Sequence, residues 1–127
     1  MIIKDSEEIY TIEINECKRI VIETFEGLFT KDAYTRFHSD YKNKVLPVIG
    51  TSPWKKISDI RNFKASNVST LMNDHNKWAE ENGMLPGIII INNNLVKSQI
   101  NNLNNPSVPT AFTNLIKAYK WLKTQGL

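Results

Sequence analysis

The chain has 127 residues, of which 41% are hydrophobic and 23% are charged, the proportions of an ordinary soluble globular protein. A chain of this length can build one core without disulfides or metals, so we expect a single domain over residues 1–127. The net charge is +3, but acidic residues separate the basic pairs and no nucleic-acid recognition signature is present, which argues against a nucleic-acid partner.

Two further classes of protein are excluded by the residue content. No apolar run approaches the roughly 18 residues of a membrane-spanning helix, so we expect no integral membrane segment. The one cysteine, Cys17, excludes an intrachain disulfide. A chain with a single cysteine, which has no partner for a disulfide, favours a reducing, cytoplasmic compartment.

The first predicted elements are two strands that pair as an antiparallel hairpin over Ile9–Phe25. Ile9–Asn15 alternates apolar and polar residues, which is the period-two pattern of a strand with one solvent-exposed face. Arg19–Phe25 is rich in β-branched residues and returns after a turn around Cys17. Such a hairpin is stable only when a helix or further strands pack on it.

A helix is expected to cover the hairpin. Gly27 should end the second strand, and Thr30 is a good N-cap. The apolar residues that follow have the spacing of one buried helical stripe: Ala33, Tyr34, Phe37, Tyr41 and Val45. Pro47 is expected to end this helix.

The central part of the chain predicts a strand, a helix and a second strand. The expected strands are Lys56–Ile60 and Ile88–Ile91, and the helix between them is expected over Ser66–Asn82. Trp78 lies on the apolar stripe of that helix, so we expect it in the core. This order within about forty residues predicts a right-handed crossover onto a parallel sheet.

The C-terminal part predicts shorter elements. Leu95–Leu103 indicates a short helix, and the segment that ends at Phe112 indicates a short further strand. Thr113 can cap a last helix, whose inward residues would be Leu115, Ala118, Tyr119 and Leu122.

Residues that usually carry catalysis or bind metals are few. His38 and His75 are the two histidines, and His75 lies on the buried stripe of the central helix, where a core histidine is commoner than a catalyst. Metal binding needs three or four converging ligands, and Cys17 has no histidine near it in the sequence. We therefore expect no catalytic residue, no metal, no cofactor and no enzyme activity.

The segment Asn62–Asn67 is the best candidate for a binding site. We expect a loop that leads from a strand into the N-terminus of the central helix, where unpaired N–H groups and the helix dipole favour an anionic group. Ser66 or Asn67 can also act there simply as the N-cap. Both interpretations stay open from the sequence.

Three stretches of sequence resemble STAS domains, and more narrowly the SpoIIAA-like group, whose fold is related to the CRAL-TRIO lipid-binding domains. They are the entry to the first helix, the third strand and the last helix: Phe25–Asp32, Ser58–Phe63 and Phe112–Leu122. The resemblance covers nearly the whole chain from Ile9. It implies an α/β fold, a STAS-like mixed β-sheet of about four or five strands covered by about four helices.

The resemblance also implies a function. In related regulators a serine at the start of the central helix is phosphorylated, and Ser66 is the matching position, although this sequence lacks the preceding aspartate and the following glycine. The implied role is a non-catalytic module that docks a protein partner, with Lys64 favouring an acidic or phosphorylated contact. The contact residues would be Asn62, Lys64, Ser66 and Asn67.

The resemblance permits one alternative. The chain could instead be a small carrier that holds a lipid or other apolar ligand between the sheet and its helices. Such a carrier needs an internal pocket of about 300 Å³ or more.

Overall fold

The computed structural model describes residues 1–65, 68–92 and 110–124. Its strands form one sheet in chain order: β1 (Ile2–Lys4), β2 (Tyr10–Asn15), β3 (Ile20–Phe29), β4 (Trp54–Ala65), β5 (Met84–Ile90) and β6 (Thr110–Phe112). The helices are α1 (Lys31–Asp40), a π-helical segment η1 (Tyr41–Val45), α2 (Leu46–Ile49), α3 (Ser69–Glu81) and α5 (Leu115–Thr124). The helix predicted over Leu95–Leu103 lies outside the described residues.

The sheet is mixed, as predicted. β1, β2 and β3 pair antiparallel, and β3 to β6 pair parallel. The predicted hairpin over Ile9–Phe25 and the predicted parallel strands at Lys56–Ile60 and around Ile88–Ile91 are therefore confirmed. The described sheet has six strands, one of which, the edge strand β1, was not predicted because so short a segment has no readable period.

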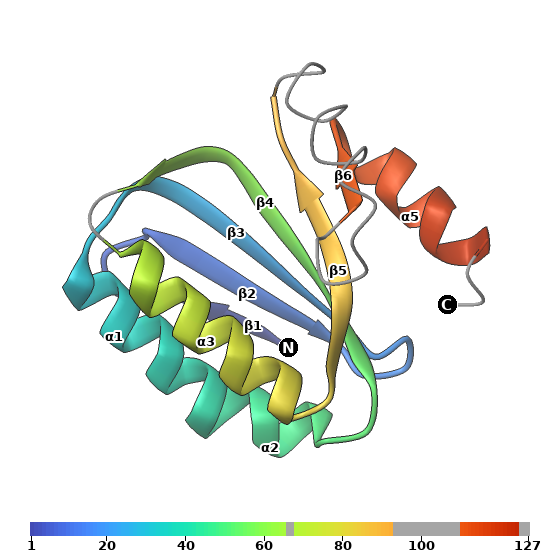
Figure 1. The fold of residues 1–127 in the computed structure, drawn as a ribbon, viewed down its shortest axis with the longest axis horizontal. Coiled ribbons are helices and arrows are strands. Elements are labelled where there is room, and N and C mark those ends of the chain that lie inside the picture. Colours follow the sequence, from blue (N-terminus) through green and yellow to red (C-terminus); the bar gives the residue numbers. More distant parts are fainter. Residues whose placement is uncertain (66–67, 93–109, 125–127) are drawn as a thin grey trace.

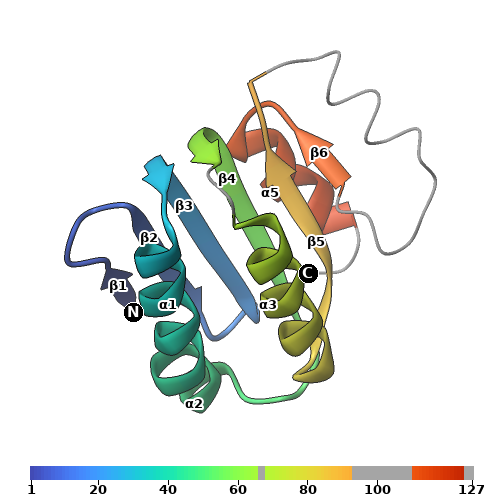
Figure 2. The same cartoon turned by 60° about the vertical axis from the view of Figure 1, so that its left-hand side comes forward.

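Helices lie on both faces of the sheet (Figure 1). α1, η1, α2 and α3 cover one face, on which α1 and α3 lie side by side, and α5 packs on the other face against β5 and β6 (Figure 2). Alternation along a strand sends successive side chains to opposite faces. On β4, Trp54 belongs to the core under α1 and α3, whereas Ile57 belongs to the core under α5. The same alternation places the Lys56 side chain on the face of the sheet that α1 and α3 cover.

The first helix begins at its predicted cap, since Thr30 Oγ1 accepts a hydrogen bond from the Ala33 N–H at 3.2 Å. The prediction that it ends at Pro47 was wrong, because it continues through η1 into α2. The buried residues recur at every fourth position: Ala33, Phe37, Tyr41, Val45 and Ile49. In a regular α-helix each such step rotates about 40° off the previous one. The wider π turn brings the stripe back onto the sheet.

β3 and β4 stay paired beyond the point where a loop was predicted. Gly27 does not end β3, because it adopts a φ of 82° within the strand, which continues to Phe29. Phe29 lies opposite Ala65 at the end of this pairing. The prediction of a loop over Asn62–Asn67 was therefore wrong for the part up to Ala65, which is strand.

The predicted central helix is present as α3, with two differences. It begins at Ser69 with Val68 in the N-cap position, so the N-cap is not Ser66 or Asn67, which lie outside the described residues. The prediction that Trp78 is a core residue holds only in part, since it is partly buried and packs at the margin of the core.

Candidate functional site

Two of the four predicted contact residues can be placed. Asn62 and Lys64 are exposed on β4, while Ser66 and Asn67 lie outside the described residues. Lys64 is opposite Leu28 of β3, which is 52% exposed. The predicted contact surface therefore includes an apolar side chain that the sequence analysis had not assigned to it.

The face of the sheet under α1 and α3 holds a buried charged cluster that was not predicted. Glu23 of β3 and Lys56 of β4 form an ion pair, with Oε1 and Nζ 3.1 Å apart and side chains only 3% and 5% exposed. His75 of α3 is fully buried, and its Nε2 lies 3.1 Å from Lys56 Nζ. Three elements far apart in the sequence thus meet at one lysine.

Hydrogen bonds complete the ion pair on both sides. Glu23 accepts from the Tyr41 hydroxyl at 2.5 Å and from the Ser58 hydroxyl at 2.9 Å, and Lys56 Nζ lies 4.5 Å from the centre of the Tyr41 ring. Burial lowers the pKa of Lys56, and Glu23 opposes that change. Burial and Glu23 raise the pKa of Tyr41 well above its ordinary value, so its hydroxyl remains a donor. Glu23 thus has three donors around it, Lys56, Tyr41 and Ser58.

His75 links this cluster to His38 of α1, because the two Nδ1 atoms are 2.9 Å apart. Burial, Lys56 and His38 hold the pKa of His75 far below its ordinary value, so the ring is neutral and carries one N–H. Lys56 donates to Nε2, which leaves that hydrogen on Nδ1, where it is donated to His38 Nδ1. His38 is only partly buried.

Strand geometry explains how the cluster forms. Glu23 and Lys56 both occupy positions whose side chains point toward α1 and α3. Gly87 of β5 lets the backbones approach closely, since a Cβ there would lie 2.1 Å from the Lys56 carbonyl oxygen. The prediction that His75 lies in the core is confirmed, whereas Glu23 and Lys56 were not predicted. The available signal was Glu23, a charged residue between the apolar inward residues Val21 and Phe25.

A pocket of about 300 Å³ opens beside this cluster, between α3 and the sheet. Among the described residues its wall is mostly apolar with four polar side chains: Phe25, Ile60, Phe63, Val68, Met72, Ile89, Glu23, Ser58, Asn73 and Asn76. Glu23 and Ser58 therefore belong both to the cluster and to the pocket wall. The pocket lies toward the carboxyl ends of β3 and β4, where open α/β sheets commonly bind ligands.

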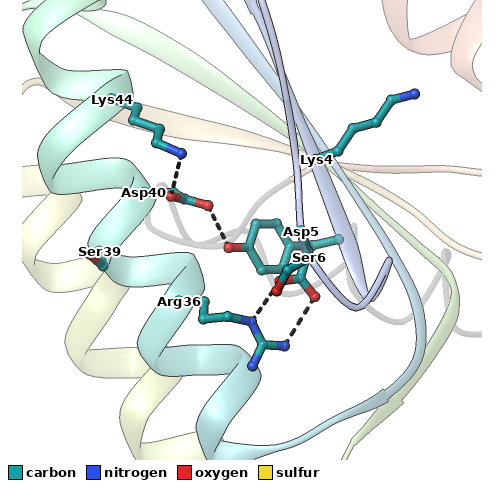
Figure 3. Close-up of a pocket in the computed structure, with 8 residues that line it drawn as sticks. Lys4, Asp5, Ser6, Arg36, Ser39, Asp40 and Lys44 are labelled. Atoms are coloured by element: carbon teal, nitrogen blue, oxygen red, sulfur yellow. Dashed lines mark hydrogen bonds and ion pairs between the residues drawn. The ribbon is translucent and has the colours of Figure 1, made fainter.

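A second pocket, of about 270 Å³, lies between α1 and the turn after β1 (Figure 3). Arg36 donates to both carboxylate oxygens of Asp5, at 2.6 and 3.1 Å. Asp40 accepts from the Tyr10 hydroxyl at 2.5 Å and pairs with Lys44 at 3.3 Å. Although burial opposes the change, Arg36 keeps the pKa of Asp5 below its ordinary value. These side chains bind one another. Their ion pairs and hydrogen bonds hold the N-terminal strands against α1.

Among residues 1–65, 68–92 and 110–124, no group of three or more His, Cys, Asp or Glu side chains converges as metal ligands would. Of the helices in these same residues, none is both long and apolar enough to cross a bilayer.

Comparison with known proteins identifies the fold. The sequence matches no described family profile and no curated protein. It is similar in structure to an uncharacterized protein of the DUF3478 family from Shewanella loihica PV-4, described as having a SpoIIAA-like fold. The TM-score is 0.65 at 18% identity, over 87% of this chain and 90% of the other. The chain therefore has the SpoIIAA-like fold that the resemblance predicted.

Proposed function

We propose that this SpoIIAA-like chain is a single-domain, non-catalytic binding module whose ligand occupies the pocket between α3 and the sheet. The observation that carries the proposal is the pocket itself, a largely apolar cavity of about 300 Å³ in the region where α/β sheets commonly bind ligands. Its volume is at the lower end of the range for small-molecule sites, about 300 to 1,000 Å³. A pocket of this volume favours a compact ligand over a long acyl chain.

The wall of the pocket also indicates the charge of the ligand. Glu23 is the one charged side chain among the described residues that line it, and Lys56 already neutralises Glu23 within the core. An anionic ligand would meet a carboxylate with no free cation beside it. The class that fits best is a neutral, mostly apolar molecule with a polar group that Asn73 or Asn76 can bind.

The hydrogen bonding of the cluster supports a binding role over a catalytic one. Glu23, Lys56 and His75 satisfy one another and their neighbours. No buried side-chain nitrogen or oxygen atom of the described residues lacks a hydrogen-bond partner. The hydrogen-bonding capacity of these three side chains is used within the fold, which supports a role in holding the core together beside the pocket.

Indole is a suitable probe, because it is small, neutral and largely apolar. We expect it to bind the wild-type protein in a calorimetric titration, and an anionic indole carboxylate to bind more weakly because of Glu23. Met72→Trp fills the pocket and should abolish binding. Thr70→Trp adds the same bulk at an exposed position of α3 and should leave binding intact. Equal binding by all three proteins would place the indole site elsewhere.

A second candidate function is docking of a protein partner on the contact surface of Asn62, Lys64 and Leu28. The exposure of Leu28 opposite Lys64 favours it, because an apolar residue beside a cation fits a partner segment that carries an acidic or phosphorylated group. Ser66 and Asn67 remain part of this proposal through the resemblance alone. We also propose a cytoplasmic location, since Cys17 is free and exposed.

Three substitutions in the proposed contact surface test docking. Lys64→Glu, Leu28→Ser and Ser66→Asp should each reduce the amount of partner captured from lysate. The thermal melt of each variant should stay near that of the wild type. Glu80→Gln, on the exposed surface of α3, is the matched control. Partners captured equally by every variant would exclude this surface.

A further inference from the structure

A continuous line of polar contacts runs from the surface of α1 to the pocket. It begins at His38, which is partly exposed, and passes through His75 at 2.9 Å and Lys56 at 3.1 Å. From Lys56 it reaches Glu23 at 3.1 Å and then Ser58 at 2.9 Å. The last two residues line the pocket, so the line joins a solvent-accessible histidine to the proposed ligand.

The direction of the hydrogen bonds makes this line sensitive to one proton. His75 carries its hydrogen on Nδ1 because Lys56 donates to Nε2. His38 must therefore present an unprotonated Nδ1 as the acceptor. An imidazolium has N–H groups on both ring nitrogens, so protonated His38 would turn a donor toward the N–H of His75, and the bond would be lost.

Aromatic rings and cations surround His38, and the cations disfavour its protonation. Tyr34 on its own helix stacks against it, with ring centres 5.8 Å apart, and the charge of Lys42 of η1 acts on it. From α3, His75 and Trp78 pack against the ring, at 5.1 and 5.0 Å.

More distant charges complete this environment: Lys56 of β4, Glu23 of β3 behind it, and Asp74 of α3 next to Tyr34. Burial, Lys42 and Lys56 lower the pKa of His38 below its ordinary value.

We propose that protonation of His38 releases α3 from α1 and weakens ligand binding in the pocket. This inference rests on the proposed function of that pocket. Neutral His38 holds α3 through His75 and Trp78, and the same helix supplies Met72 and Asn76 to the pocket wall. A shift of α3 therefore changes the shape of the pocket, and binding and protonation are linked.

The chain offers an unusually clear assignment of this titration. It contains two histidines, and the pKa of His75 is held far below the range in which an ordinary histidine titrates. A histidine signal that titrates while the protein is folded is therefore that of His38. By reciprocity, a bound ligand should lower the pKa of His38 further.

The experiment measures indole affinity by calorimetry one pH unit above and one below the pKa of His38, which NMR of the ring protons gives directly. We expect at least about fivefold weaker binding at the lower pH. His38→Asn keeps an acceptor for His75 but does not titrate, so its affinity should be independent of pH. Lys42→Gln removes a neighbouring charge and should move the transition to higher pH, an effect that a merely structural role of His38 would not produce.

The outcomes separate this inference from the proposed function. Indole that binds the wild-type protein equally at both pH values overturns the linkage and leaves the pocket as the binding site. Absence of binding at both values overturns the pocket and the linkage together. A His38 ring that does not titrate while the protein remains folded, or a His38→Asn protein with unchanged pH dependence, also overturns the linkage.

Discussion

Lys56 Nζ lies 3.1 Å from Glu23 Oε1 in the interior, where the two side chains are 5% and 3% exposed. Removing two charges from water is expensive, and their attraction compensates only when further hydrogen bonds are made. Tyr41, Ser58 and His75 make those bonds here. The pair is therefore a weak source of stability as a whole and a severe liability when one member is removed.

Glu23→Gln should lower the free energy of unfolding by about 3 to 5 kcal/mol, since it leaves the Lys56 charge buried without its partner. Lys56→Met should lower the free energy of unfolding by a similar amount, because it leaves the Glu23 charge buried without its partner. The double variant should cost clearly less than the sum of the two, which urea denaturation of all four proteins measures as a coupling energy. Additive losses would show that the two charges do not depend on each other.

Stability should fall as the pH is lowered from 7 to 5. The pKa of His75 is far below its ordinary value in the fold and near 6.5 in the unfolded chain. Below about pH 6.5 the unfolded state therefore binds more protons, and the free energy of unfolding drops by up to about 1.4 kcal/mol per pH unit.

His38 adds a smaller contribution of the same sign, because solvent screens its partly exposed ring. His38→Asn should therefore keep most of this dependence even though its ligand affinity no longer changes with pH. Urea midpoints at pH 7, 6 and 5 test both statements, and a wild-type midpoint that stays constant would mean that His75 is protonated in the fold.

Trp54, in the core between the sheet and the helices α1 and α3, and Trp78, which packs against that core, should differ in how much their truncation destabilises the fold. Trp54 is 2% exposed, and its Nε1–H donates to the Asn82 carbonyl at 3.0 Å, so Trp54→Ala should cost about 3 to 5 kcal/mol. Trp78 is partly buried, and Trp78→Ala should cost less. Circular dichroism in urea compares them, because each variant changes the tryptophan fluorescence itself by removing one of the three tryptophans. A larger loss at Trp78 would contradict the burial of the two rings.

Gly87→Ala should destabilise the sheet through a clash, since the new Cβ would meet the Lys56 carbonyl oxygen at 2.1 Å. We expect a loss of about 1 to 3 kcal/mol, typical of overpacking. Gly27→Ala is the useful comparison, because nothing lies within 4 Å of its Cβ position and only its φ of 82° opposes the change. If Gly87→Ala proves the milder of the two in thermal melts, the strands have room to separate there.

The sequence could predict elements whose evidence is local. Periodicity identified the hairpin, α3 and the isoleucine strand, and the cap at Thr30 followed from one residue. The contacts of Glu23, Lys56 and His75 could not be predicted, because they depend on how β3 and β4 align, with Glu23 opposite Ser58, and on where α3 packs over them. The loop predicted from Asn62 failed for the same kind of reason, since pairing with β3 overrides the weak strand preference of asparagine and lysine.

The π turn of η1 makes the length of the first helix adjustable. Such a turn amounts to one extra residue in a regular helix, and Asn43 within it is exposed. Deleting Asn43, together with Pro47→Ala to restore a backbone donor, should leave Val45 and Ile49 on the sheet. The same deletion within α3 would rotate every later side chain by about 100°. We therefore expect this helix to tolerate a one-residue deletion within η1, although a deletion in a regular helix would turn its buried stripe away from the sheet.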